Sequence, residues 1–258
     1  MLLQFYKYQG TGNDFVIVDN RADNIQLSKE QVAFICDRHF GIGADGLMLL
    51  NKHHSYDFEM IYYNADGALG TMCGNGGRCL TKFAFDNGIQ PTMYHFIASD
   101  GEHEAIIDEN GWIYLKMIDV KEVSQVHEAT VLNTGSPHYI KPVSGLSNFD
   151  VFTEGKNVRY NETYNKAGIN VNFVEWNEDT LFVRTYERGV ENETFSCGTG
   201  VTAAAIAMSA DTIGAHETKI RTLGGNLLIK FNKVDAQHYN NVWLCGPASL
   251  VYEGQITI

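Results

Sequence analysis

The sequence predicts an α+β fold of two pseudo-symmetric, strand-rich lobes, each with a central helix, and an active site in the cleft between them. Short motifs recur at an offset of 123 or 124 residues, close to half of the 258-residue chain. An offset that stays nearly constant indicates a duplicated structural unit. The recurring pairs are Thr11-Gly12-Asn13 with Thr134-Gly135-Ser136, Cys73-Gly74-x-Gly76 with Cys197-Gly198-x-Gly200, and Gly101 with Gly225.

In each predicted lobe, strands precede and follow one helix along the chain. Segments 56–64 and 180–187 are rich in aromatic and β-branched residues, as strands are. Each leads through a glycine-containing loop into Cys-Gly-x-Gly and then into a helical run, at 78–87 and 201–210. A strand, a glycine turn and a further strand follow each helix.

The duplication sets the expected domain boundaries. We expect an N-terminal lobe at residues 1–118 and a C-terminal lobe at 119–247. The closing segment, 248–258, reads as a strand that returns to the N-terminal lobe. Only four prolines occur and no low-complexity linker is present, so we expect the lobes to pack closely.

Charge and cysteine content exclude several classes of protein. The formal net charge is −12 without a lysine or arginine cluster, which argues against a nucleic-acid partner. No run of about 18 apolar residues is present, so no membrane span is expected. The N-terminus lacks the pattern of a secretory signal. Together with the odd count of five cysteines, this predicts reduced thiols and a cytoplasmic location.

No metal or cofactor is expected. There is no Cys-x-x-Cys, and Cys73 and Cys79 stand too far apart for a usual zinc-ligand spacing. The GTGNDF segment lacks the third glycine of a dinucleotide fingerprint, and no Gly-Lys-Ser/Thr occurs. No lysine stands in a setting that marks a Schiff base. Buried, inert thiols are expected at Cys36, Cys79 and Cys245.

The two Cys-Gly-x-Gly turns predict a specific chemistry. A helix N-terminus exposes unpaired N–H groups and carries partial positive charge, which favours a thiolate and holds a carboxylate. Two such turns across a cleft would place one thiol on each face of a substrate α-carbon. One thiolate would remove the α-proton and the other thiol would return a proton, inverting the centre. A packing cysteine explains either turn alone, but gives no reason for the recurrence.

Eight motifs, in order, carry a resemblance to a known family. The chain is similar along nearly its whole length to diaminopimelate epimerases, cofactor-independent enzymes of lysine and cell-wall precursor synthesis. The motifs are GTGNDF, DRHFGIGADG, NADG, MCGNGGRC, TGSPH, INVNF, YERG and SCGTG.

The resemblance implies a role for individual residues. It implies a small-molecule substrate, diaminopimelate, and Cys73 and Cys197 as the acid/base pair. The carboxylate at the reacting centre would be bound by Gly74, Asn75, Gly198 and Thr199. The distal amino-acid group would be recognised by Asn64, Asn170, Glu187 and Arg188, with Asn13 nearby. The residues that tune the two thiols would be His138 and Glu187.

Three departures from the family pattern affect distal recognition rather than the cysteines. Ser136 stands where asparagine is usual, Gly46 where glutamine often stands, and Ala68-Leu69 where a polar residue and glutamate are common. Two alternatives stay open: a proline or hydroxyproline racemase, and a non-enzymatic binding module with structural cysteines. The oligomeric state is also open, with a homodimer as one option.

Overall fold

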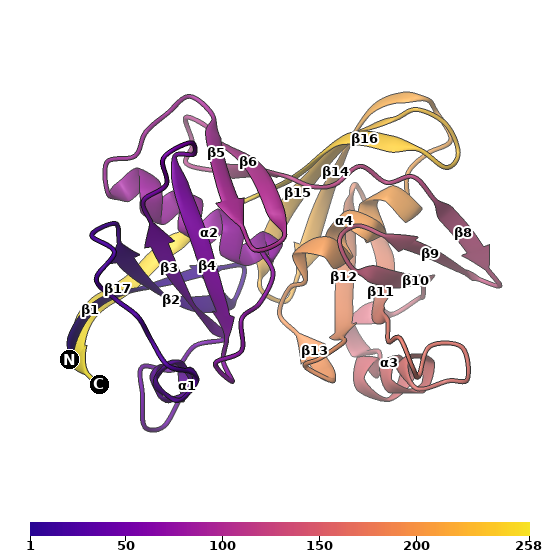
Figure 1. Cartoon of the computed structure of the whole chain (residues 1–258). Coiled ribbons are helices and arrows are strands. Elements are labelled where there is room, and N and C mark those ends of the chain that lie inside the picture. Colours follow the sequence, from indigo (N-terminus) through magenta and orange to yellow (C-terminus); the bar gives the residue numbers. More distant parts are fainter. The chain divides into compact units, whose positions relative to one another are not determined.

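Seventeen β-strands and four α-helices make up the chain, which divides into two units (Figure 1). The computed structural model describes all residues, 1–258. Unit 1 comprises Met1–Leu115 with Gly246–Ile258, and unit 2 comprises Lys116–Cys245. Strands outnumber helices in both units, so the predicted α+β class with two strand-rich parts is confirmed.

Unit 1 contains eight strands and two helices. Their bounds are Leu2–Gly10 (β1), Asn13–Asn20 (β2), Lys29–Cys36 (α1), Gly46–Asn51 (β3), Phe58–Asn64 (β4), Gly74–Asp86 (α2), Tyr94–Ala98 (β5), Gly101–Ile107 (β6), Ile113–Lys116 (β7) and Ser249–Thr257 (β17). The strands pair in the order β17-β1-β2-β3-β4-β5-β6-β7, antiparallel except at β2–β3 and β4–β5. A parallel pair needs a crossover connection, and α1 and α2 lie in these two crossovers.

Unit 2 contains nine strands, two α-helices and one short 3₁₀ helix. Their bounds are Val123–Val126 (β8), Ala129–Asn133 (β9), Pro137–Pro142 (β10), Leu146–Asn148 (η1), Val151–Arg159 (α3), Asn170–Asn177 (β11), Thr180–Glu187 (β12), Asn192–Thr194 (β13), Gly198–Ala207 (α4), Gly214–Thr222 (β14), Gly225–Lys233 (β15) and Tyr239–Gly246 (β16). The main order is β8-β9-β10-β11-β12-β14-β15-β16, with β13 paired to β12.

The two units have the same order of parallel and antiparallel strand pairs. In unit 2 the parallel pairs are β10–β11 and β12–β14, the same two places in the order as in unit 1. In each unit, the strand at the first edge of the pairing order comes directly after the last strand of the other unit along the chain. Strand β8 follows β7 but pairs with β9, and β17 follows β16 but pairs with β1. The sequence repeat is therefore a repeat of topology.

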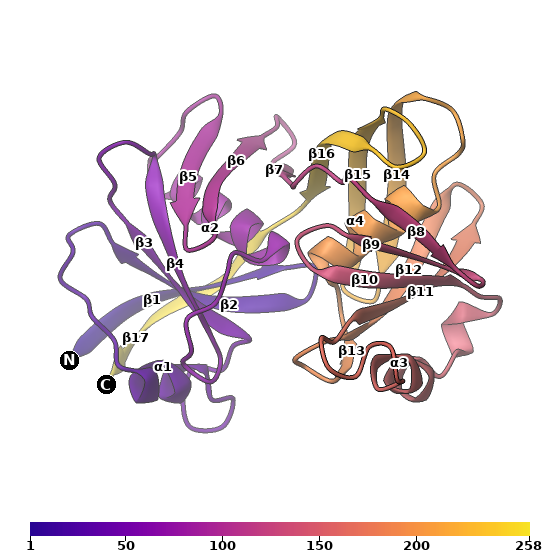
Figure 2. The same cartoon turned by 45° about the vertical axis from the view of Figure 1, so that its right-hand side comes forward.

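A central helix lies among the strands of each unit. Helix α2 packs against β1, β2, β3, β6 and β17, and α4 packs against strands β9 to β12 with β14 and β15. Figures 1 and 2 show each of these helices enclosed by strands of its own unit. Most residues around α4 are small or apolar, and even Thr202 is fully buried, a composition expected of a buried helix. Its Ala203, Ala204 and Ala205 are completely buried.

The other two helices cover the opposite faces of the strands. In unit 1, Val32 and Ile35 of α1 pack on Val16 and Leu47 of the adjacent strands. Helix α1 begins with a capping box in which Ser28 and Gln31 exchange side-chain and backbone hydrogen bonds. In unit 2 the corresponding core contains Val151 of α3. In each unit, one face of the strands thus packs on the central helix and the opposite face packs on the outer helix, α1 or α3.

An ion-pair network that is buried at Lys7 and exposed at Arg38 and Asp45 supports the N-terminal strands of unit 1. Lys7 is 5% exposed and lies 2.7 Å from Asp14, and Arg38 contacts both Asp14 and Asp45, each at 2.7 Å. Burial favours protonation of Asp14, but hydrogen bonds and ion pairs with Arg38 and Lys7 outweigh it and lower the pKa of Asp14 to about 2. The network joins β1, β2 and the segment before β3.

This network predicts acid-sensitive stability. The folded pKa of Asp14 lies below its ordinary 3.8, so its stabilising contribution is complete above about pH 5 and is lost as the pH falls towards 2. We expect Asp14→Asn to lower the free energy of unfolding by about 2 kcal/mol at pH 7. Urea unfolding at pH 7, 4 and 2.5 should show the gap to wild type shrinking with acid. A gap that does not change with pH would contradict this assignment.

Candidate active site

Cys73 and Cys197 occupy the same structural position, the N-cap of the central helix in their respective units. Cys73 precedes α2 with φ −106° and ψ 148°, and Cys197 precedes α4 with φ −113° and ψ 112°. All five cysteines are reduced. A residue at the N-cap places its side chain beside the unpaired N–H groups of the first turn. Both thiols therefore lie where a thiolate is favoured.

The contacts of the two sulfurs differ. Sγ of Cys73 accepts a hydrogen bond from the backbone N–H of Gly76 at 3.1 Å. Sγ of Cys197 instead lies 3.5 Å from the hydroxyl of Thr199. Cys73 is partly exposed, whereas Cys197 is 7% exposed. The same turn thus holds one thiol by a backbone donor and the other beside a side-chain hydroxyl.

The second glycine of each Cys-Gly-x-Gly motif leaves room for neighbouring side chains. A Cβ at Gly76 would lie 3.0 Å from Sγ of Cys73, and a Cβ at Gly200 would lie 2.4 Å from Oδ1 of Asn172. Real Cβ atoms essentially never approach as closely as the contact at Gly200, so that position requires glycine, whereas at Gly76 a side chain would be tightly packed against the thiol. The motif spacing is explained by this packing.

In unit 1, Asn13 lies beside the first turn of α2. Its Oδ1 accepts from Nδ2 of Asn75 at 3.2 Å, and its Nδ2 donates to Asp45 at 2.6 Å. Asp45 in turn contacts Arg38. The structure therefore brings together two predicted binding residues, Asn13 and Asn75. It adds Asp45 and Arg38 as their support, which the sequence presented only as parts of DRHFGIGADG.

Arg78 fixes the loop that carries Asn13. This arginine is completely buried within α2. Its guanidinium donates to the carbonyl of Gly74 at 3.3 Å and to Oγ1 of Thr11 at 3.1 Å. Thr11 adopts a left-handed conformation with φ 51°. The sequence predicts Arg78 only as the start of the helical run 78–87, because an isolated arginine carries no signal of burial.

Asn64 ends β4 and lies next to Gly46, one of the three departures from the family pattern. Gly46 pairs with Asn64 across β3 and β4. A Cβ at Gly46 would lie 2.5 Å from Cε2 of Tyr62, and a Cβ at Gly70 would lie 2.6 Å from the same ring. The ring of Tyr62 thus fills the space that a side chain at position 46 would need. No sequence motif singles out Tyr62.

In unit 2, His138 lies in a hydrogen-bonded cluster beneath α4. Its Nε2 is 2.9 Å from Oγ1 of Thr199, and its Nδ1 is 3.1 Å from Nδ2 of Asn172. Oγ1 of Thr185 donates to Oδ1 of Asn172 at 2.8 Å. Burial, with a smaller contribution from the charge of Arg188, lowers the pKa of His138 to about 3. His138 is therefore neutral throughout the physiological range.

Asn170, Glu187 and Arg188 meet at the end of β12. Oδ1 of Asn170 accepts from the backbone N–H of Arg188 at 2.9 Å. A carboxylate oxygen of Glu187 accepts from Oγ1 of Thr194 at 2.8 Å, and the guanidinium of Arg188 donates to the carbonyl of Ala167 at 3.2 Å. The three predicted distal residues of unit 2 therefore lie together.

Two of the departures lie in turns. Ser136 is in the turn between β9 and β10, where its carbonyl accepts from the N–H of Thr134. Ala68 and Leu69 belong to the turn after β4, in which the N–H of Asn64 donates to the carbonyl of Ala68 at 2.9 Å.

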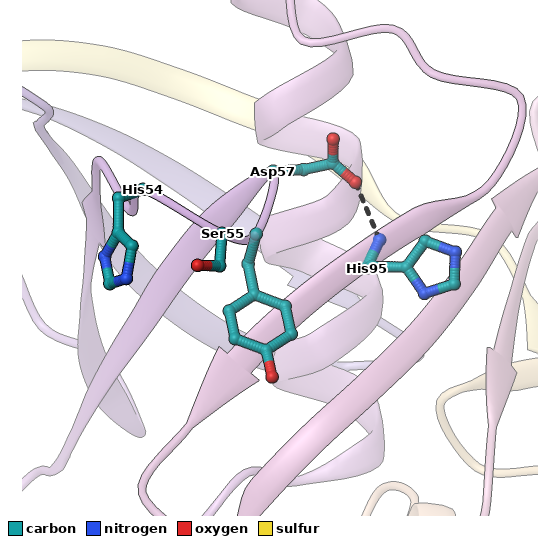
Figure 3. A pocket seen from close by; sticks show the side chains of 5 residues that line it. His54, Ser55, Asp57 and His95 are labelled. Atoms are coloured by element: carbon teal, nitrogen blue, oxygen red, sulfur yellow. Dashed lines mark hydrogen bonds between the residues drawn. The ribbon is translucent and has the colours of Figure 1, made fainter.

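A shallow hollow lies at the start of β4, away from the predicted residues. Figure 3 shows its lining, His54, Ser55, Tyr56, Asp57 and His95, with Asp57 accepting from the backbone N–H of His95 at 2.7 Å. None of these is a predicted site residue. No group of three or more His, Cys, Asp or Glu residues is arranged to hold a metal ion. No helix has the length and apolarity needed to cross a membrane.

Comparison of the sequence with known families and proteins gives a consistent result. The family model described as diaminopimelate epimerase matches residues 5–121 and 130–251. A diaminopimelate epimerase of Flavobacterium psychrophilum is 49% identical over 260 residues, covering 98% of this chain and all of the relative. One of Chlorobaculum tepidum is 43% identical over 260 residues, covering 96% of this chain and 99% of the relative.

Solved structures share the fold at low sequence identity. A phenazine biosynthesis protein of the PhzF family from Bacillus anthracis matches with a TM-score of 0.74 at 15% identity, covering both chains completely. A probable proline racemase from Agrobacterium radiobacter matches with a TM-score of 0.69 at 13% identity, covering 99% of this chain and 93% of the other. At these identities the likeness establishes the fold alone.

Burial of neutral His138 predicts a second acid-sensitive contribution. The unfolded chain binds a proton near the ordinary pKa of 6.5, whereas the folded chain does so near 3. Stability is therefore retained above pH 6.5 and falls by about 1.4 kcal/mol per pH unit as the pH drops towards 3. We expect His138→Gln to flatten this dependence in urea unfolding between pH 7.5 and 4.5. The exposed His54→Gln serves as the control, and an unchanged slope in His138→Gln would refute the assignment.

The contact between Gly46 and Tyr62 predicts a cost for any side chain at position 46. We expect Gly46→Ala to lower the free energy of unfolding by about 1–3 kcal/mol, the usual cost of overpacking. In a Tyr62→Ala background the cost should be smaller but not zero, because the carbonyl oxygen of Tyr63 also lies 2.6 Å from the added Cβ. Urea unfolding of the four chains measures this. Equal costs in both backgrounds would show that the tyrosine ring is not the obstacle.

Proposed function

The chain belongs to the diaminopimelate epimerase family, and from that premise we propose that it interconverts LL- and meso-2,6-diaminopimelate. This reaction would serve the synthesis of lysine and of peptidoglycan precursors. The observation that carries the chemical proposal is the placement of Cys73 and Cys197 at the N-caps of the two central helices. A duplicated thiol at a duplicated helix start supports a two-base reaction.

We propose that the two cysteines act on one α-carbon. In one direction a thiolate takes the α-proton, and the electron pair of the broken C–H bond passes to carbon and its carboxylate. The other cysteine, as a thiol, then delivers its proton to the opposite face and becomes the thiolate. The centre is inverted with no net change in protons. The reverse direction begins from the protonation state that the forward direction leaves.

We propose that the reacting carboxylate binds to the first turns of α2 and α4. The backbone N–H groups of Gly74, Asn75, Gly198 and Thr199 belong to the positions that have no partner within an α-helix. Negative charge on the carboxylate grows as the α-proton leaves, and helix-end donors stabilise it most at that point. These donors would lower the barrier as well as bind the substrate.

We propose that the distal amino-acid group is recognised by Asn13, Asn64, Asn170, Glu187 and Arg188. Arginine binds a carboxylate through two parallel hydrogen bonds. The Glu187 carboxylate and the asparagine amide oxygens accept from an ammonium group. The close grouping of Asn170, Glu187 and Arg188 supports this assignment. An analogue without a distal group would leave these residues unpaired and would be rejected.

The proposed acid and base are side chains of the chain itself, so we propose that the enzyme acts without pyridoxal phosphate or metal. Two thiols that must alternate between thiol and thiolate require reducing conditions. This supports a cytoplasmic location, where such conditions are kept.

Deuterium exchange tests the proposed reaction. We expect the wild-type protein in deuterated buffer to convert LL- to meso-diaminopimelate with deuterium at the inverted carbon. Proton NMR measures this as loss of the α-proton signal. Cys73→Ala and Cys197→Ala should each lose about 10²–10⁴-fold or more in epimerisation. Each single variant keeps one base, so each should exchange the α-proton of only one of the two isomers. The isomer should differ between the variants.

L-proline is the control substrate, with reductant present throughout. Exchange of proline in place of diaminopimelate would transfer the two-thiol mechanism to another substrate. A single variant that still interconverts the isomers at the wild-type rate would refute the two-base assignment.

A further inference from the structure

Equivalent positions beneath the two central helices carry different chemistry. In unit 1, Phe15 pairs with Gly46 at the start of β3, and in unit 2, His138 pairs with Asn170 at the start of β11. The third residues of these two strands are Met48 and Asn172. The cross-strand partner of Met48 is Tyr62, and that of Asn172 is Thr185. Unit 2 thus has His138, Asn172 and Thr185 where unit 1 has Phe15, Met48 and Tyr62.

The same difference appears directly below the two thiols. The nearest neighbours of a Cβ at Gly76 would be Sγ of Cys73 and then the side chains of Met48 and Met60. At Gly200 the nearest neighbour would be Oδ1 of Asn172, at 2.4 Å. Asn172 and His138 are completely buried, and Thr185 is 3% exposed. Buried polar side chains are costly unless hydrogen-bonded, and these three are bonded to one another, whereas Phe15 and Met48 at the equivalent positions of unit 1 are apolar.

The orientation of the Asn172 amide follows from its neighbours. Nδ2 of Asn172 lies 3.3 Å from the carbonyl oxygen of Tyr139 and 3.1 Å from Nδ1 of His138. A carbonyl can only accept, so the group facing Tyr139 must be the amide nitrogen. The amide oxygen then faces the hydroxyl of Thr185 at 2.8 Å. The opposite orientation would place two acceptors together.

We propose that Asn172 is a positioning residue that holds His138 in the neutral tautomer protonated at Nε2. Nδ1 of His138 accepts the N–H of Asn172 and therefore carries no proton. The proton of the neutral ring is then on Nε2, which donates to Oγ1 of Thr199 at 2.9 Å.

The effect reaches Cys197 through Thr199. Because Oγ1 of Thr199 accepts from His138, its own hydrogen is directed elsewhere, and Sγ of Cys197 lies 3.5 Å away. The carbonyl of Thr199 is held by Oγ1 of Thr134 at 2.8 Å, which fixes the residue. Donated hydrogen bonds run from Thr185 through Asn172, His138 and Thr199 to the sulfur. A donor to a thiolate stabilises it relative to the thiol.

This inference rests on the proposed function only in taking Cys197 as an acid and base. The tautomer and the hydrogen bond to the sulfur are properties of the resting protein. They can be measured without substrate, so a failure of the epimerase assay would leave them to be judged separately.

The tautomer is tested by nitrogen NMR of protein labelled with ¹⁵N-histidine. The His138 signals are those lost in His138→Phe. We expect a neutral ring protonated at Nε2 between pH 5.5 and 8. An acceptor at position 172 reverses the preference, so Asn172→Asp should place a proton on Nδ1. Wild type protonated at Nδ1, or Asn172→Asp without a proton there, would overturn the proposal.

Thr202→Val is the matched control for the NMR experiment. Thr202 is buried in the same helix and donates to the carbonyl of Gly198 at 2.9 Å, with no contact to Asn172 among its hydrogen bonds. Its substitution disturbs the first turn of α4 without changing the donor to His138. The His138 signals should keep their wild-type form in this variant, and a tautomer change there would show that general disturbance suffices.

The connection to the thiol is tested by iodoacetamide alkylation against pH, read at each cysteine by mass spectrometry. His138→Phe copies the residue of unit 1, and Thr199→Val removes the hydroxyl. Both should raise the alkylation midpoint of Cys197 by about one pH unit, and more than that of Cys73. Thr199→Ser should restore the wild-type midpoint. Equal shifts at both cysteines, or none at Cys197, would overturn the route through Thr199.

Discussion

The first N–H groups of an α-helix have no partner within the helix, and the candidate site is built on this property at two places. At the N-cap of α2, Cys73 brings its sulfur to one of these donors, the N–H of Gly76, and Cys197 holds the equivalent position at α4 beside the Thr199 hydroxyl. The glycine three residues later leaves room beside the thiol, because a Cβ at Gly200 would collide with the buried Asn172 and a Cβ at Gly76 would lie tightly against Sγ of Cys73. The rest of each unit encloses the helix in strands, so that its start lies at a fixed place. The requirement for a cysteine at a helix start therefore explains the sequence motif, and it also supports the proposed chemistry.

Duplication preserved the backbone and changed what supports it. Unit 1 ties its Thr11 loop to α2 through the buried Arg78, whereas unit 2 ties Thr134 directly to the carbonyl of Thr199. Beneath the helices, apolar residues in unit 1 correspond to His138 and Asn172 in unit 2. The proposed reaction needs a thiolate on one face of the α-carbon and a thiol on the other, so the two cysteines do not need identical surroundings. The two half-sites can therefore be tuned separately.

Motifs with a fixed local meaning were readable from the sequence, and single supporting residues were not. The repeat, the strand-rich class and the two cysteine turns followed from spacing and glycine positions. Asn172 and Tyr62 stand in strands whose alternation predicts only which face they occupy. Their roles depend on strand register and on parallel pairing across long crossovers. The sequence marks Gly46 only as a missing side chain, whereas in the structure the ring of Tyr62 fills that space.

The pairing of β1 with β17 bears on how the chain matures during synthesis. Unit 2 is continuous, Lys116–Cys245, so all of its strands are translated before β17 exists. Unit 1 needs both ends of the chain, since Leu2 pairs with Thr257 and Gln9 with Ser249. Until β17 has left the ribosome, β1 has β2 on one side and an open edge on the other, which is a site for unwanted strand addition. While the segments between β1 and β17 are being translated, β1 therefore lacks one of its two partner strands.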